Sequence, residues 1–241
     1  MTLLPAPPDR TLLPTLLPLE NGDRLSISEF ERRYHAMPQL KKAELIEGVV
    51  YVASPLRFEP HAEPHGNLIG WLWTYKIATS GVRLGDNPTV RLDLDNEPQP
   101  DVVLLIDARC GGQSQIDEDG YVENAPELVA EVAASSASID LHDKMRVYRR
   151  NGVQEYIVWR VLENNLDWFS LQAGDYVPLE ADEAGMIKSL RFPGLWLAVA
   201  ALLSGDMATV LAVLQQGLHS TEHGEFVQQL QQQLSQGTSN S

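Results

Sequence analysis

The chain has 241 residues, which fits one domain of moderate size with a small appendage. A 44% hydrophobic content excludes global disorder, and a single cysteine excludes an intrachain disulfide framework and favours a reducing, cytoplasmic compartment. No leader pattern and no run of about 18 apolar residues is present, so neither a signal peptide nor a membrane span is expected. The net charge of −15 counts against a broad basic face for nucleic acid, although it describes the whole surface rather than one cleft.

The N-terminal part predicts a flexible proline-rich arm over residues 1–25 and a helix over 26–37. A hairpin over 42–54 and a second helix over 63–81 are predicted next. Ser28 and Glu31 have the spacing of a capping box in the first helix. Glu47-Gly48 is expected at the hairpin turn, and Gly81 is expected to end the second helix.

The middle of the chain predicts a loop over 110–120, a helix over 138–152 ended by a glycine, and strands or hairpins over 88–95, 100–107, 126–132, 154–161 and 165–180. Because strands and helices alternate, the predicted fold class is α/β, a mixed β-sheet flanked by helices. Residues 26–195 are expected to form this domain.

The C-terminal part changes character. Two apolar helices are expected within 195–218, broken at Ser204-Gly205, with Asp206 available to cap the second. A glutamine-rich helix follows from residue 221. We therefore expect a C-terminal helical extension over 196–235 and a disordered tail over 236–241.

A charge inside an apolar strand is the most informative feature. Residues 128–132 are apolar except for Glu131, and a carboxylate in a strand core is costly unless it is paired or binds a metal. Side chains alternate along a strand, so Glu131 shares a face with Val129 and Ala133. Asp101 begins another buried strand. If the two strands are neighbours, the carboxylates of Asp101 and Glu131 come close at one end of the sheet.

Two carboxylates held together repel and need a cation. Mg²⁺ is the natural candidate, because it binds one or two carboxylates and keeps several waters. Such an ion stabilises charge on a phosphoryl oxygen, and a lysine such as Lys144 can orient water or neutralise the transition state, which is the chemistry of phosphodiester hydrolysis. Structural alternatives remain. Glu131 could pair with an arginine or a backbone N–H, Asp101 could be a turn residue, and Lys144 could form a surface pair with Asp140.

Several segments together resemble the PD-(D/E)XK nuclease superfamily and, more narrowly, the Uma-type putative restriction endonuclease family. The matching pieces are AELIEGVVYVASP (43–55), a histidine before a leucine-rich helix (His65), PQPDVVLL (98–105), NAPELVAEV (124–132) and DLHDKMRVYRRNGVQEYIV (140–158). They lie in the family's order over roughly residues 28–195. The resemblance implies a restriction-endonuclease-like fold for the predicted mixed sheet and its flanking helices. It also implies a Mg²⁺-dependent DNA endonuclease, with Mn²⁺ as a substitute, and nuclease folds of this kind often act as homodimers.

The resemblance also implies roles for individual residues. Asp101 matches the Asp of the PD element and Glu131 the second acidic residue, so both are expected to bind the metal. The lysine normally stands two residues after that acid, where this chain has Ala133, and Lys144 on the following helix matches the place from which the family supplies it. Glu44 matches the family's acidic residue on the first hairpin, expected to touch the metal or its water.

Other residues are left open or set aside. Three residues are open as members of the site. They are Glu47 at the hairpin turn, His65, and Tyr148, which shares a helix face with Lys144. His61 and His65 lack the H-E-x-x-H pattern, so a zinc site is not expected. The basic patch on the same helix is expected to be a solvated face rather than a phosphate path; it comprises Arg146, Arg149 and Arg150 together with Lys144.

Three functions therefore compete. The first is an active endonuclease that cuts DNA. The second is a nuclease-like fold that no longer cuts and serves as a binding or regulatory module, favoured by the acidic charge and by the altered E-V-x-S-P-S segment after Glu131. The third is an interaction module on the C-terminal helices, which would make a homodimer and can coexist with either of the others.

Overall fold

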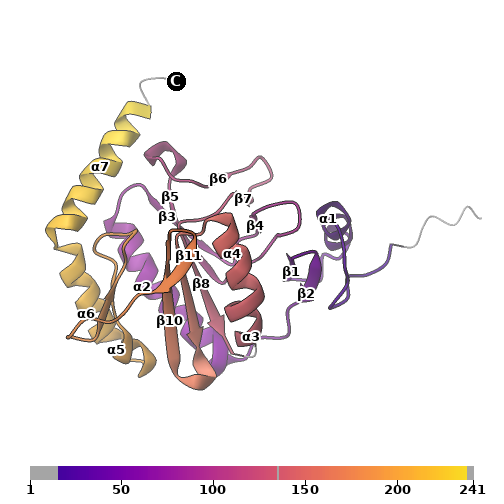
Figure 1. Ribbon diagram of the computed structural model, residues 1–241, viewed down its shortest axis with the longest axis horizontal. Helices are drawn as coiled ribbons and strands as arrows, with labels where there is room; N and C mark the ends of the chain where they lie inside the picture. The colour runs from indigo at the N-terminus through magenta and orange to yellow at the C-terminus, as the bar shows by residue number, and fades with distance from the viewer. Residues whose placement is uncertain (1–15, 135, 238–241) are drawn as a thin grey trace, which may run out of the picture.

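The computed structural model describes residues 16–134 and 136–237, and its centre is a six-stranded mixed sheet in the order β11-β10-β9-β8-β5-β3 (Figure 1). The strands are β3 (Val82–Asp86), β5 (Val102–Ile106), β8 (Leu128–Ala133), β9 (Glu155–Arg160), β10 (Asn165–Gln172) and β11 (Asp175–Pro178). β8 and β9 run parallel, and the other neighbours are antiparallel. The predicted α/β class with a mixed sheet is confirmed.

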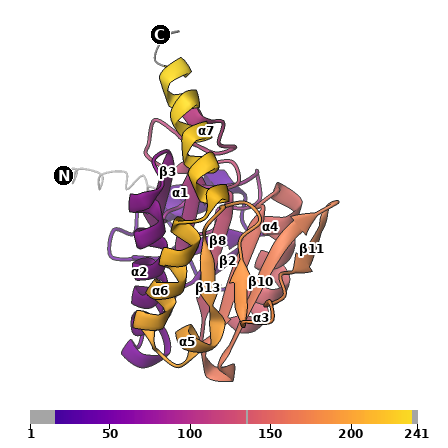
Figure 2. The same cartoon turned by 90° about the vertical axis from the view of Figure 1, so that its left-hand side faces the viewer.

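Helices cover both faces of this sheet (Figure 2). On one face lie α2 (Glu63–Ala78), α5 (Val199–Leu203), α6 (Met207–Leu218) and α7 (Thr221–Gly237). On the other lie α3 (Ala137–Ile139) and α4 (Met145–Asn151). A π-helical turn precedes α2 and another joins α3 to α4, at Phe58–Ala62 and Asp140–Lys144.

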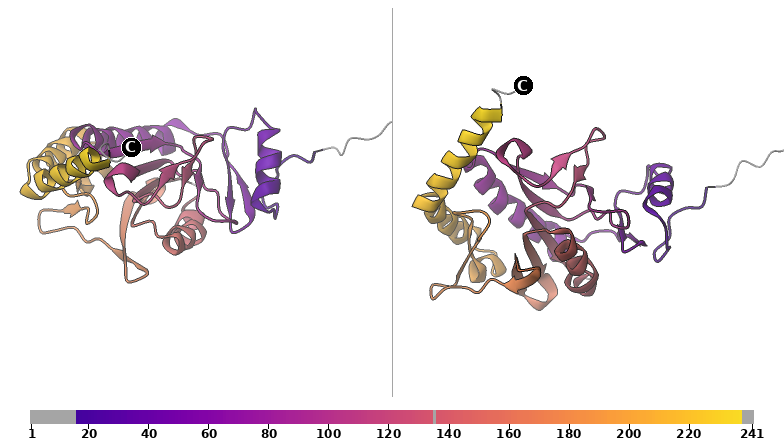
Figure 3. Two further views of the ribbon diagram at one scale, coloured as in Figure 1. Left: turned by 90° about the horizontal axis from the view of Figure 1, so that it is seen from above. Right: turned by 45° about the horizontal axis from the view of Figure 1, so that its top comes forward.

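An N-terminal unit sits beside the main sheet (Figure 3). It contains α1 (Ile27–His35) and the predicted hairpin of β1 (Ala43–Ile46) and β2 (Val49–Val52). The helix is capped by Ser26, whose side chain accepts from the Glu29 N–H, so the predicted cap at Ser28 is wrong by two residues. The described end of the predicted arm is packed rather than loose, because Leu19 is buried in the core of this unit; residues 1–15 lie outside the described residues.

Two small sheets complete the fold. One has the order β4-β7-β6, with β4 (Val90–Arg91), β6 (Gln115–Ile116) and β7 (Val122–Glu123); the other pairs β12 (Met186–Lys188) with β13 (Trp196–Ala198). Short 3₁₀ turns occupy Ala108–Cys110 and Val161–Glu163. The strand predicted over 88–95 was too long, because its partner β7 has only two residues and the chain turns between Asp93 and Asn96.

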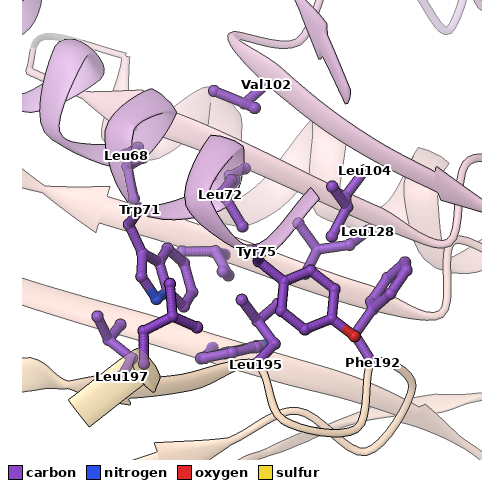
Figure 4. Close-up of a cluster of buried hydrophobic side chains, with 14 of the residues drawn as sticks. Leu68, Trp71, Leu72, Tyr75, Val102, Leu104, Leu128, Phe192, Leu195 and Leu197 are labelled. Carbon is purple, nitrogen blue, oxygen red and sulfur yellow. The ribbon is translucent and has the colours of Figure 1, made fainter. Parts of the chain in front are cut away.

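The main core packs α2 and the segment that carries Phe192, Leu195 and Leu197 against the sheet (Figure 4). The C-terminal helices add side chains to the same core. Trp71 and Tyr75 of α2 are fully buried and donate to the carbonyls of Trp196 and Pro193 at 3.1 and 2.9 Å. The same cluster includes Leu202, Val210, Leu214 and Leu230. The helices predicted as an extension after residue 195 therefore share one core with the sheet. Most of the predicted tail, 238–241, lies outside the described residues, whereas α7 reaches Gly237.

Alternation along β8 divides its side chains between two cores. Leu128, Ala130 and Val132 face the main core, while Val129 and Ala133 face a second core under α4. The predicted alternation is confirmed, and it points Glu131 to the α4 side of the sheet. Across residues 16–134 and 136–237, none of the helices combines the length and apolar character that crossing a bilayer requires.

Glu155, at the start of β9, fixes the loop that leads to β13. Its carboxylate is fully buried and accepts from Trp168 Nε1, Ser189 Oγ and the N–H groups of Leu190 and Arg191, at 2.7–3.1 Å. Glu155→Ala would leave these buried donors unpaired. We expect it to lower the free energy of unfolding by about 3–5 kcal/mol in denaturant titration. The exposed Glu180→Ala should change it by under about 0.5 kcal/mol, and equal losses would refute this role.

Glu97 gives a pH-dependent test of how the N-terminal unit docks. Arg91 of β4 pairs with Glu31 of α1 at 2.7 Å and lies 3.6 Å from Glu97. Burial and the charge of Glu31 raise the pKa of Glu97 from 4.5 to about 8, although Arg91 opposes the shift. Because the folded-state pKa lies above the unfolded value, the stability linked to this proton is present below about pH 4.5 and is lost as the pH rises to about 8.

Glu97→Gln removes this titration. At pH 4.5 we expect the variant and the wild type to have similar free energies of unfolding. The variant should then gain up to a few kcal/mol on the wild type by pH 8–9, measured by urea unfolding across pH. A difference between the two proteins that does not vary with pH would contradict the raised pKa.

Candidate active site

Asp101 and Glu131 meet because β5 and β8 are neighbours. Val102 pairs with Ala130 in the antiparallel register, so the next step outward sets Asp101 opposite Glu131. The Asp101 N–H donates to Glu131 Oε2 at 3.3 Å, and the Val132 N–H donates to Asp101 Oδ2 at 2.8 Å. Both acidic residues are only 3% exposed. The predicted adjacency of the two strands is confirmed.

Lys144 reaches this pair from the π-helical turn before α4. Its Nζ lies 2.8 Å from Glu131 Oε1, 2.8 Å from Glu44 Oε1 and 3.7 Å from Asp140 Oδ1. The structure thus brings together the four residues predicted for the site. Lys144 and Asp140 are buried, so the alternative of a surface pair does not hold. Ala133, where the family pattern would place the lysine, is packed in the core under α4.

Neighbouring groups hold these carboxylates in place. Tyr148, one of the residues left open, donates its hydroxyl to Glu131 Oε1 at 2.9 Å. The Gln99 N–H donates to Glu44 Oε1 at 2.8 Å. Glu47 lies outside the cluster, because it pairs with Arg146 at 2.9 Å on the surface. Tyr148 therefore contacts the site, and Glu47 does not.

Two basic residues beside Asp101 were not foreseen as partners of that carboxylate. Lys42 Nζ lies 2.9 Å from Asp101 Oδ1, and His61 Nε2 lies 3.3 Å from Asp101 Oδ2. His65, which was left open, has its Nε2 3.2 Å from the Asp101 carbonyl. Lys42 stands two residues before Glu44, and that period-two spacing was the available signal that both side chains share a face.

The two acids have opposite electrostatic environments. Burial alone would raise the pKa of Asp101, but hydrogen bonds and charge from His61 and Lys42 hold it well below its usual range. Burial raises the pKa of Glu131 to about 8, with neighbouring carboxylates adding to the effect and Lys144 opposing it. Burial alone would lower the pKa of Lys144, yet the surrounding carboxylates raise it well above its ordinary value.

The basic patch on α4 is neutralised by acidic neighbours. Arg146 pairs with Asp143 as well as Glu47, and Arg149 pairs with Asp175. These exposed ion pairs fit the predicted solvated helix face. A cavity of about 470 Å³ lies beside these ion pairs, and neither Asp101, Glu131 nor Glu44 lines it. Its lining residues are Leu141, His142, Met145, Arg146, Arg149, Asp175 and Tyr176.

A divalent ion bound at this cluster would take its protein ligands from Asp101 and Glu131. Within the part of the chain that the structure describes, no three His, Cys, Asp or Glu side chains are arranged to hold a metal. Two carboxylates from adjacent strands nevertheless suit Mg²⁺, which takes one or two and completes its shell with water. The Lys42 ammonium against Asp101 Oδ1 shows that this position accepts a cation. Asp101 and Glu131 thus fit a hard divalent ion.

Comparison with known proteins shows the family and the fold of the chain. The model of the Uma2 family, described as a putative restriction endonuclease, matches residues 27–200, well over half of the sequence. The chain belongs to this family. A crystal structure from Anabaena variabilis, titled as a putative nuclease of a domain family of unknown function, is similar with a TM-score of 0.56 and 15% identity, covering 72% of this chain and 96% of that one. At that identity the likeness shows the fold. Comparison with curated proteins gives no significant match.

Tyr148 offers a test of how firmly Glu131 is held in this family member. Tyr148→Phe removes a hydrogen bond to a buried carboxylate, and Tyr156→Phe removes one from an equally buried hydroxyl to the neutral Asp140 carbonyl. Hydrogen bonds to charged groups contribute more. At pH 9, above the raised pKa of about 8 for Glu131, this carboxylate is ionised, and we expect losses of about 2 and about 1 kcal/mol in urea unfolding. A smaller loss for Tyr148→Phe would argue that Glu131 is held by other contacts.

Proposed function

We propose that this chain is a divalent-metal-dependent DNA endonuclease that hydrolyses phosphodiester bonds. One observation carries the proposal: a buried lysine ammonium lies 2.8 Å from Glu131 and 2.8 Å from Glu44, while Glu131 adjoins Asp101 on the next strand. Membership in a restriction endonuclease family supports the same activity, with DNA as substrate. Mg²⁺ is the proposed ion, with Mn²⁺ as a substitute.

In this proposal the residues of the site have separate roles. Asp101 and Glu131 would hold the ion, which would supply positive charge for a phosphoryl oxygen and lower the pKa of a water. Lys144 would place its ammonium where negative charge develops, and burial would strengthen that interaction. Glu44 orients Lys144 from β1, and Tyr148 orients Glu131 from α4.

A non-cutting binding or regulatory module is the second candidate. It is favoured by the net charge of −15 and by the acidic partners of the α4 arginines, which leave that helix face with little positive charge for a DNA backbone. A homodimer is a further proposal, because cutting both strands calls for two sites. It is compatible with either activity.

Substitutions at two positions separate metal binding from chemistry. Asp101→Asn should abolish Mg²⁺ binding in calorimetry and cleavage of plasmid DNA, because it removes a charged ligand. Lys144→Met should keep Mg²⁺ binding but reduce the cleavage rate at least about 100-fold, because it removes charge stabilisation. The exposed Lys41→Met controls for net charge and should cut like the wild type. Circular dichroism should verify that each variant folds.

The alternative predicts a different pattern. If Mg²⁺ or Mn²⁺ binds and no DNA is cut under varied conditions, the binding module replaces the endonuclease. DNA affinity that falls steeply with salt would then show phosphate contacts. Equal Mg²⁺ binding by wild type and Asp101→Asn would reject the assigned ligand.

A further inference from the structure

Lys42 lies in the approach to Asp101. The residue directly precedes β1, and its Nζ is 2.9 Å from Asp101 Oδ1 and 3.4 Å from Asn87 Oδ1. The Lys42 side chain is 20% exposed, whereas that of Asp101 is 4% exposed. Lys42 is thus the partner of Asp101 that also reaches towards solvent.

The carboxylate oxygens of Asp101 and Glu131 differ in the partners that they contact. Asp101 Oδ2 accepts from the Val132 N–H and lies 3.3 Å from His61, so Oδ1 is the oxygen whose contact is Lys42. Glu131 Oε1 is taken by Lys144 and Tyr148, while among the described residues Oε2 receives only the longer 3.3 Å bond from the Asp101 N–H. Asp101 Oδ1 and Glu131 Oε2 are therefore the less committed oxygens of the two acids, and Lys42 occupies the first.

We propose that Lys42 is a resident counter-cation that competes with the divalent ion for Asp101 and swings outward when the ion binds. The inference rests on the proposed function, because it assumes that Asp101 is a metal ligand. Lys144 differs from Lys42, since it is 3% exposed and contacts carboxylates from two strands, which fixes it in place. Lys42 has the exposed Asn87 as a second acceptor along its way out.

This arrangement predicts that removing Lys42 strengthens metal binding. A positive charge a few Å from a divalent ion opposes binding even at the effective dielectric of a protein. In calorimetry with Mg²⁺ and Mn²⁺, Lys42→Met should bind about tenfold more tightly than the wild type. Lys41→Met removes the same charge one residue away, on an exposed side chain, and should bind like the wild type.

Thermal unfolding gives a second readout. Without metal, Lys42→Met leaves Asp101 with less compensation, so its Tm should fall below that of the wild type. Added Mg²⁺ should raise the Tm of Lys42→Met by more than it raises the wild-type Tm. Lys42→Gln keeps a donor for Asp101 and should show the same direction, which covers the case in which Lys42→Met fails to fold.

The outcomes separate this inference from the proposed function. Affinity in Lys42→Met and Lys42→Gln that equals or falls below that of Lys41→Met overturns the counter-cation role, even if DNA is cut and Asp101→Asn abolishes cutting. Tighter metal binding without cleavage under any condition supports the role of Lys42 and rejects the endonuclease. No metal binding in any variant rejects both.

Discussion

The antiparallel register of β5 and β8 is the constraint on which the site depends. It places Asp101 opposite Glu131 and turns both carboxylates to the α4 side of the sheet, where Lys144 lies. A slip of one residue would move Glu131 into the apolar face under α2. The main core of α2 and the C-terminal helices therefore matters for function, because it fixes which side chains of β8 face each way.

Burial of a glutamate beside an apolar strand does not by itself mark the site. Glu127 and Glu155 are as buried as Glu131. Glu127 accepts from the N–H groups of Ile106 and Gln113, and Glu155 accepts chiefly from neutral donors of one loop. Glu131 instead contacts a lysine and faces a second carboxylate. The structural alternative considered for Glu131, pairing with a backbone N–H, describes Glu127 fully and Glu155 in part. Glu131 has one backbone donor at 3.3 Å beside its lysine.

Local patterns predicted the elements that carry the site, and long-range contacts explain what they missed. The hairpin around Glu47, the strand with Glu131 and the helix ended by Gly152 follow from periodicity and turn residues, which are local signals. β3 was missed, because an edge strand with Arg83 and Gly85 lacks an apolar run. The partnership of Lys42 with Asp101 spans 59 positions, and spacing within one element cannot reveal it.

The charges of the cluster favour cations, which is why two lysines lie in it and why a divalent ion is proposed there. The carboxylates of Asp101, Glu131, Glu44 and Asp140 surround the ammoniums of Lys42 and Lys144. Negative charge is in excess, and burial makes that excess costly. The raised pKa of Glu131 is one expression of it, since a proton would cancel part of the charge. A divalent ion would cancel the excess negative charge while leaving every carboxylate ionised, provided that Lys42, the more exposed lysine, moves away from Asp101.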